Sequence, residues 1–273
     1  MLLTPEIMIL IVLLLIVGLF AGVLAGLLGV GGGIVIVPAL YHVFGYLDID
    51  PAIRMHLAVG TSLATIIPTS IRSVLSHNKK GAVDGSLLKR WAAPLFIGVL
   101  IGTALASIVD NTGLTLVFAV VALGVACHMA FVSGEWRLRD QLPGGPVGAL
   151  VPTLIGGISA MMGIGGGTLG VPTLTAFSVA IHRAVATAAG FGLIIAIPGT
   201  AGFIIAGWGA ANLPLGSIGY VNLLGFAVIV PATLLAVPWG VKIAHWLPPR
   251  PLRLAFAFFL AATSLRMFWD IFG

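Results

Sequence analysis

The chain has 273 residues, of which 59% are hydrophobic and only 8% are charged, and its mean hydropathy is +1.17. An average soluble domain has about 25% charged residues, so this composition excludes a water-soluble protein and indicates an integral membrane protein. The net charge is +5, and the single cysteine, Cys127, excludes an internal disulfide. No basic residue precedes the first apolar run, so we interpret residues 6–28 as a membrane helix and not as a signal peptide.

Apolar segments bounded by charged residues, prolines or glycine clusters follow one another along the chain, which predicts an all-α polytopic membrane protein. The ten segments are residues 6–28, 33–45, 55–73, 91–109, 112–132, 147–165, 167–180, 184–206, 218–241 and 252–272. A helix needs about 20 residues to cross a bilayer. Segments 33–45 and 167–180 follow glycine runs and are short, so whether they cross fully is left open.

The positions of lysine and arginine predict the orientation, because positive charge gathers on the cytoplasmic side. If all ten segments cross, one side holds Arg72, Lys79, Lys80, Lys89, Arg90, Arg137, Arg139, Arg183, Lys242, Arg250 and Arg253, and the other holds Arg54 and Arg266. If the two short segments do not cross, the asymmetry is much weaker. The sharper division favours ten crossings, with both termini periplasmic and with loops 74–90, 133–146 and 242–251 in the cytoplasm.

Two stretches recur along the chain and predict an internal repeat. "GVGGGIVIVP" at 29–38 matches "GIGGGTLGVP" at 163–172, and "AVGTSLATIIPTS" at 58–70 resembles "AAGFGLIIAIPGT" at 188–200. We therefore divide the chain into an N-terminal repeat, 1–132, a cytoplasmic linker, 133–146, and a C-terminal repeat, 147–273. Each repeat has five segments, and an odd number inverts the second repeat in the membrane. Inverted repeats are typical of secondary transporters, whose substrate sites lie near mid-membrane.

The two glycine runs predict helix breaks, because three consecutive glycines are poor helix material. Each following short segment would begin inside the bilayer as a partly re-entrant helix. A helix N-terminus carries about half a positive charge and several free N–H groups, so two such ends would bind an anion without any lysine or arginine. The predicted site glycines are Gly31, Gly32, Gly33, Gly165, Gly166 and Gly167.

Close helix packing is the alternative explanation for glycines in membrane helices. It is the preferred explanation for the glycines spaced four apart, Gly18, Gly22 and Gly26, and for the series Gly98, Gly102 and Ala106. For the two triple-glycine runs it stays open beside anion binding. A nucleotide-binding loop is excluded, since neither run is followed by the GK[ST] sequence of such loops.

Hydroxyl side chains near the runs could donate hydrogen bonds to an oxyanion. They are Thr61, Ser62 and Thr65 in the first repeat and Thr168, Thr173 and Thr187 in the second. For any single hydroxyl, a bond to a carbonyl of its own helix is the competing interpretation. Arg54 and Arg183 precede the related stretches, and we expect them as gate residues at the two mouths of the path.

All eight acidic residues fall at segment ends or in loops, so no buried carboxylate suggests proton or sodium transport. His42 and His128 lie within segments and could titrate. No metal-ligand pattern, cofactor motif or catalytic constellation is present in the sequence, so we expect no metal, no cofactor and no enzymatic activity.

The paired stretches "GLLGVGGGIVIVP" and "GGISAMMGIGGGTLGVP", followed by "HLAVGTSLA" and its second-half counterpart, resemble the TauE/SafE sulfite exporter family over essentially the whole chain. The resemblance implies a bacterial inner-membrane transporter for small sulfur-containing anions such as sulfite, sulfoacetate and other organosulfonates. It implies that the six run glycines frame the transport site, with Thr61 and Ser62 beside it.

Phe191 and Gly192 stand in the second half where Thr61 and Ser62 stand in the first, so the expected pocket has one apolar wall. We expect an exporter, with an anion channel or an uptake permease as the alternatives. The expected partners are the anion and the lipid bilayer. Nucleic acid is not expected, and a homodimer is left open.

Overall fold

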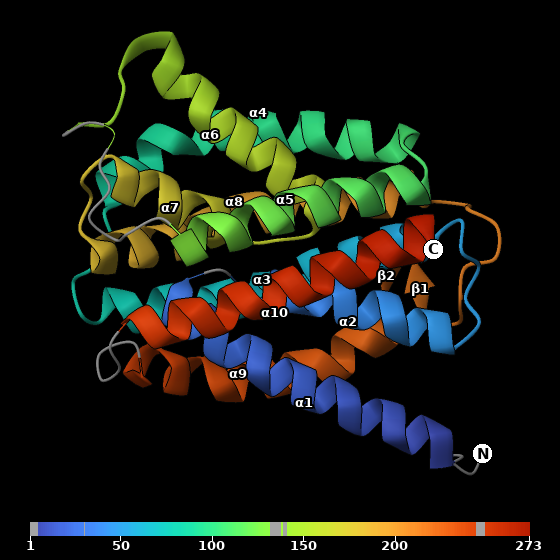
Figure 1. Cartoon of the computed structure of the whole chain (residues 1–273). Helices are drawn as coiled ribbons and strands as arrows, with labels where there is room; N and C mark the ends of the chain where they lie inside the picture. Colours follow the sequence, from blue (N-terminus) through green and yellow to red (C-terminus); the bar gives the residue numbers. More distant parts are fainter. Residues whose placement is uncertain (1–4, 30, 132–137, 139–140, 244–248) are drawn as a thin grey trace.

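The computed structural model describes residues 5–29, 31–131, 138, 141–243 and 249–273. These residues form ten helices and one short antiparallel pair of strands, β1 (Ser217–Ile218) and β2 (Val221–Asn222). The helices are α1 (Pro5–Leu28), α2 (Gly33–Tyr46), α3 (Arg54–Asn78), α4 (Gly85–Ile108), α5 (Asn111–Phe131), α6 (Gly145–Met162), α7 (Gly167–Ala176), α8 (Ile181–Ala206), α9 (Leu223–Ile243) and α10 (Pro249–Phe272). The predicted all-α architecture is confirmed (Figure 1).

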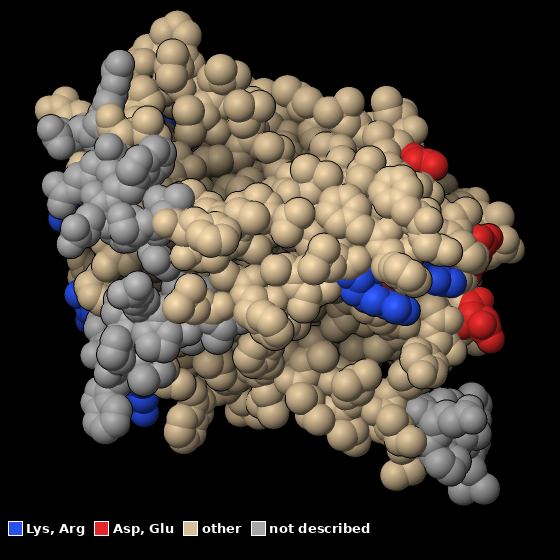
Figure 2. Space-filling model, in the orientation of Figure 1, with Lys and Arg blue, Asp and Glu red and all other residues tan. Residues whose placement is uncertain are grey.

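Seven helices in the described part of the chain are long and apolar enough to cross a membrane: α1, α3, α4, α5, α6, α8 and α9. Many large apolar side chains on these helices are exposed, as a lipid-facing surface requires. Figure 2 shows a broad band of uncharged surface between two ends that carry charge, with the visible acidic side chains all at the right-hand end. These features fit a multi-span membrane protein.

The strongest helix pairings join elements that lie far apart in the sequence. α1 packs along α9, α4 along α6, α3 along α8 and α5 along α10, and further contacts link α3 to α9 and α4 to α8. Each pairing joins a helix that precedes the 133–146 stretch to one that follows it. The core of the protein is therefore built between the two halves of the chain.

Glycines spaced four apart allow the closest of these approaches. A Cβ atom on Gly26 would overlap the carbonyl oxygen of Val237 on α9, and one on Gly102 would overlap that of Gly157 on α6. Gly18 and Gly22 likewise face α9. The packing role predicted for these glycines is confirmed.

Both triple-glycine runs interrupt the helices as predicted. The first lies between the end of α1 at Leu28 and the start of α2 at Gly33, where Gly31 and Gly32 have φ angles of 70° and 79° that L side chains rarely adopt. The second lies between α6 and α7. With 14 and 10 residues, α2 and α7 are only about 21 Å and 15 Å long at 1.5 Å per residue.

The two short helices end at opposite ends of the molecule. α2 leads into the start of α3 at Arg54, whereas α7 leads into the start of α8, where Arg183 lies 3.9 Å from Asp84 just beyond the far end of α3. α3 has 25 residues and is about 37 Å long. In Figure 1, α2 and α7 accordingly approach the middle of the bundle from the right and from the left.

Asp84 caps the N-terminus of α4. Replacing Asp84 should lower the stability of the fold by an amount that depends on pH. Its carboxylate accepts hydrogen bonds from the Ser86 hydroxyl and from the Ser86 and Leu87 amides, which lower its pKa below the ordinary 3.8. Because the folded-state pKa is lowered, the stabilisation is present above pH 3.8 and is lost as the pH falls through the folded value. We expect Asp84→Ala to cost about 1 kcal/mol at neutral pH.

Thermal unfolding of the purified protein in detergent at pH 7 and at pH 3 checks this expectation. Asp84→Asn is the control, because asparagine caps helices about as well as aspartate. An equal loss of stability for Asp84→Ala at both pH values would contradict the predicted pH dependence, and no loss at pH 7 would contradict the cap's contribution.

Candidate functional site

The structure brings the two glycine turns into contact. A Cβ atom on Gly33, the first residue of α2, would overlap the carbonyl oxygen of Gly163 and lie 3.0 Å from the Cα of Ile164. A Cβ atom on Gly31 would lie 3.5 Å from the Cα of Gly165. All six predicted site glycines are buried. The starts of α2 and α7, which are 134 residues apart in the sequence, are thus parts of one buried locus.

Helix α3 supports this locus from one side. The Ser62 hydroxyl is fully buried and donates a 2.7 Å hydrogen bond to the carbonyl oxygen of Gly163, which fixes the second turn. Ile66, one helical turn further on, fills the space beside Gly31 and Gly33. In this conformation Ser62 therefore positions the turn with its only proton and does not offer that proton to a ligand.

Four of the other candidate hydroxyls have structural partners. Thr65 and Thr173 donate to carbonyl oxygens of their own helices at 2.7 Å. For these two residues the hydroxyl therefore bonds within its own helix, as the alternative to anion binding predicts. Thr61 accepts from the amide of Asn222 at 2.8 Å. Thr187 accepts from the amide of Asp84 at 3.0 Å, at the end of the molecule where α4 and α8 begin.

Four buried hydroxyls lack a hydrogen-bond partner among the described residues: those of Thr168, Ser70, Ser73 and Ser159. Thr168, the second residue of α7, is 3% exposed, and Ser70 on α3 is 1% exposed. Ser70 lies against Gly192 of α8. Gly192 in turn lies against the second turn, because a Cβ atom on Gly166 would be 3.2 Å from the Gly192 amide nitrogen. Leaving a buried hydroxyl unpaired costs about 1–3 kcal/mol, so the hydroxyls of Thr168 and Ser70 are suited to receive a ligand.

Ser70 was not among the residues predicted from the sequence. The spacing Ser62, Ile66, Ser70 places three side chains on one face of α3, which is a signal that the sequence does contain. This spacing indicates a site only once the tertiary contacts of the face are known. In the structure the face contacts both the first turn and Gly192 of α8.

Phe191 forms the apolar wall of the locus. It is fully buried, and its ring stacks on Trp91 of α4 with centroids 5.2 Å apart. A Cβ atom on Gly166 would overlap the Cβ of Phe191. Phe191 therefore lies between Trp91 of α4 and the second turn.

The locus has a positive electrostatic character without charged side chains. Residues 29–38 and 163–172 include no Asp, Glu, Lys or Arg. The first amides of a helix have no carbonyl partner within that helix, and the aligned peptide dipoles place about half a positive charge there. The starts of α2 and α7 are thus suited to hold an anion, which the unpaired hydroxyls of Thr168 and Ser70 could also bind.

Arg54 and Arg183 lie away from the turns, near the two ends of α3. Arg54 donates a 2.9 Å hydrogen bond to the carbonyl oxygen of Ile49 and borders an open cavity. Arg183 is largely exposed and pairs with Asp84. The structure thus does not bring these arginines to the glycine locus.

A bundle of apolar helices that is interrupted at a buried, uncharged locus is typical of multi-span membrane transporters. The chain belongs to the TauE/SafE family: the family model described as "Sulfite exporter TauE/SafE" matches residues 14–267.

Two relatives cover most of this chain. A "Probable membrane transporter protein" of Haemophilus influenzae is 33% identical over 89% of this chain and 92% of its own length. A "Probable membrane transporter protein" of Methanocaldococcus jannaschii is 28% identical over 88% of this chain and 89% of its own length. No solved structure is significantly similar to the chain.

Proposed function

We propose that the protein is a secondary transporter that exports small sulfur-containing anions, such as sulfite, sulfoacetate or other organosulfonates, across the bacterial inner membrane. The carrying observation is the contact between the first glycine turn, at the start of α2, and the second glycine turn, which leads into α7, together with the unpaired hydroxyls of Thr168 and Ser70. The family description names sulfite export, which supports this class of substrate.

An inverted repeat of halves 1–132 and 147–273 is part of the proposal. The pattern of helix contacts supports it. In such a repeat each of α1–α5 corresponds to the helix five places later, so the α1–α9 pair corresponds to α6–α4 and the α3–α9 pair to α8–α4. All four of these pairs are in contact. The lengths of α2 and α7, about 21 Å and 15 Å, would place their starts near the middle of a 30 Å hydrocarbon core. Half of the expected linker, 133–146, lies outside the described residues.

Alternating access fits the contact between the turns better than an open channel does. Because Gly33 and Gly163 touch, an anion reaches the amides at these helix starts only when the halves move apart. Rocking of one half against the other around a fixed site is how many inverted-repeat transporters work.

The distribution of charge supports periplasmic termini. α1 begins and α10 ends at one end of the molecule in Figure 1, whereas the α3–α4 connection, which contains Lys79 and Lys80, lies at the other end. Positive charge is retained on the cytoplasmic side, so the end with Lys79 and Lys80 would be cytoplasmic. Whatever the orientation of the protein, the inside-negative potential favours exit of a monovalent anion by about 2.3 kcal/mol per 100 mV.

Flux of labelled sulfite and labelled sulfoacetate into and out of proteoliposomes tests the proposal. We expect saturable flux that an imposed membrane potential accelerates in the direction of the positive compartment. Absence of flux for either anion under any gradient would count against the function. Currents far above carrier turnover would instead favour a channel, and inward-only flux would favour an uptake permease.

Ser70→Ala should separate binding from stability. The Ser70 hydroxyl is buried without a partner in the described structure, so its removal should leave the unfolding temperature unchanged or raise it. If the hydroxyl binds the anion, the KM for flux should rise about tenfold, as expected for the loss of one hydrogen bond to a charged group.

Thermal unfolding and flux are measured on the same preparation. Ser107→Ala is the matched control, because Ser107 is exposed and donates only to the carbonyl oxygen of Ala104 in its own helix. A lower unfolding temperature with an unchanged KM would assign Ser70 a purely structural role.

A further inference from the structure

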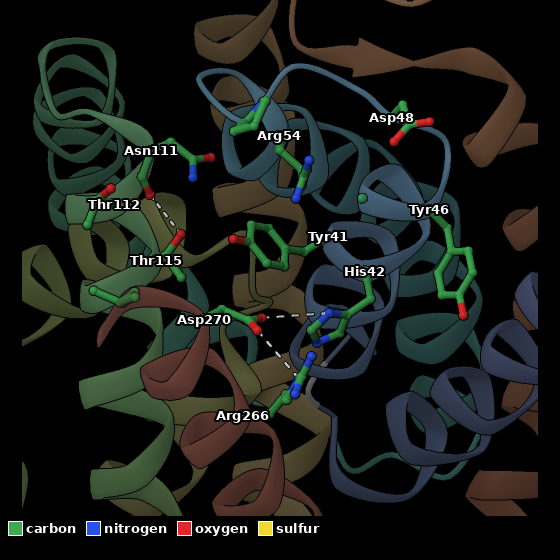
Figure 3. Close-up of a pocket in the computed structure, with 13 residues that line it drawn as sticks. Tyr41, His42, Tyr46, Asp48, Arg54, Asn111, Thr112, Thr115, Arg266 and Asp270 are labelled. Atoms are coloured by element: carbon green, nitrogen blue, oxygen red, sulfur yellow. Dashed lines mark hydrogen bonds and ion pairs between the residues drawn. The ribbon is translucent and has the colours of Figure 1, made fainter. Parts of the chain in front are cut away.

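A cavity of about 1010 Å³ opens at the end of the molecule where α3 begins and α10 ends. Its wall combines residues of α2, of the α2–α3 connection and of the starts of α3 and α5 with the last turns of α10 (Figure 3). Among its described lining residues there is no glycine of the two turns. The cavity is therefore separate from the glycine locus.

Arg54 reaches into this cavity with hydrogen-bonding capacity to spare. One terminal nitrogen donates to the carbonyl oxygen of Ile49 at 2.9 Å, and the guanidinium lies 5.8 Å from the centroid of the Tyr41 ring. The Nε atom is buried and has no hydrogen-bond partner in the described part of the chain. A guanidinium has five N–H donors in a planar fork that matches carboxylate or sulfonate oxygens.

Arg266 supplies a second guanidinium from α10. Its Nε lies 3.4 Å from Oδ1 of Asp270, whose other oxygen lies 3.9 Å from Nδ1 of His42 on α2. Asp270 thus orients Arg266 through Nε, and the terminal nitrogens remain for a ligand. Figure 3 shows Arg54 and Arg266 reaching toward the same space from opposite sides, with Tyr41 and His42 between them.

Neutral donors complete the wall. The side-chain oxygen of Asn111 accepts from the amide of Met55 at 2.6 Å, which leaves the NH2 group of Asn111 to face the cavity. Thr112 and Tyr41 add hydroxyl groups. Asn111 and Thr112 also form the first turn of α5, whose N-terminus favours an anion.

We propose that this cavity is a second anion-binding site, on the outer side of the transport path, in which Arg54 and Arg266 hold a sulfonate or carboxylate group between them. Two guanidiniums line the cavity, of Arg54 and Arg266, and two carboxylates, of Asp270, which pairs with Arg266, and of Asp48, which is exposed. The volume lies at the upper end of the range for small-molecule sites, so it accommodates an organic anion with its carbon chain. The choice of a sulfur anion as ligand rests on the proposed function.

Protection of arginines from chemical modification tests the site. The purified full-length protein is treated with phenylglyoxal, which reacts with guanidinium groups, in the presence and absence of sulfoacetate, and each arginine is followed by mass spectrometry. We expect sulfoacetate to slow the modification of Arg266 and Arg54 at least about threefold, because a bound anion covers them in proportion to its occupancy. Arg72, exposed on α3 near the opposite end, should react at the same rate throughout.

Two variants make the test specific. Arg54→Gln should abolish the protection of Arg266, because the anion loses one of its two guanidinium partners, whereas Arg72→Gln should leave the protection intact. Equal modification rates with and without sulfoacetate would overturn the site. So would equal protection by sodium chloride at the same ionic strength, since that result would indicate only screening.

The outcomes also separate this site from the transport function. Protection without flux in proteoliposomes would support the outer site and overturn the proposed function. Flux without protection would support transport and overturn the outer site.

Discussion

Gly33→Ala is expected to lower anion flux about 10- to 100-fold, because a methyl group at this position would push the two glycine turns apart. The added Cβ would overlap the carbonyl oxygen of Gly163, and backbone atoms cannot rotate away as a flexible side chain can. Overpacking of this kind costs about 1–3 kcal/mol, and each 1.4 kcal/mol corresponds to a factor of ten. Initial rates of sulfoacetate or sulfite flux in proteoliposomes measure the effect.

Gly124→Ala on α5 is the matched control, because a Cβ atom there would meet no atom within 4 Å. We expect its flux to equal that of the unmodified protein. Full activity of Gly33→Ala would show that the contact between the turns does not lie on the transport path.

Ser62→Ala is expected to lower both stability and flux, in contrast to Ser70→Ala. It removes the 2.7 Å hydrogen bond to the Gly163 carbonyl and leaves that buried oxygen without its side-chain donor. The penalty is about 1–3 kcal/mol, which corresponds to a loss of about 5- to 150-fold in the population of the correctly placed second turn. The unfolding temperature and the flux should therefore fall together.

Ser76→Ala is the control for this change, because Ser76 is half-buried on the same helix and donates to the carbonyl oxygen of Arg72 within that helix. A normal unfolding temperature for Ser62→Ala would mean that the second turn is held by backbone packing alone. Ser62→Thr keeps the hydroxyl and should retain more activity than Ser62→Ala if the hydrogen bond is what matters.

Hydrophobicity predicts the helices well because lipid requires long apolar segments with internally paired backbones. It fails at polar helix ends. α4 begins at Gly85, ahead of the expected residue 91, because its first turns are polar and are nucleated by the Asp84 cap. α7 ends at Ala176 and not at 180, since the chain turns at Ser178 with a φ of 64°.

The glycine breaks are also predictable from the sequence, because consecutive glycines oppose a helix wherever they fall. The partners of the candidate hydroxyls are not. Thr61 accepts from Asn222, which is 161 residues away, and Ser62 donates to Gly163, which is 101 residues away. Arg266 faces the same cavity as Arg54 only because α10 packs along α5. Such contacts depend on tertiary arrangement, which the spacing within one segment does not determine.

The exchange of helix partners between the two halves has a consequence for biosynthesis. The glycine-lined face of α1 is matched by α9, which begins only at Leu223, so α1 enters the bilayer long before its partner has been translated. The same holds for α3 with respect to α8. The first five helices must therefore remain in the membrane without their main packing partners, and the tertiary core forms only after the last helices have left the ribosome.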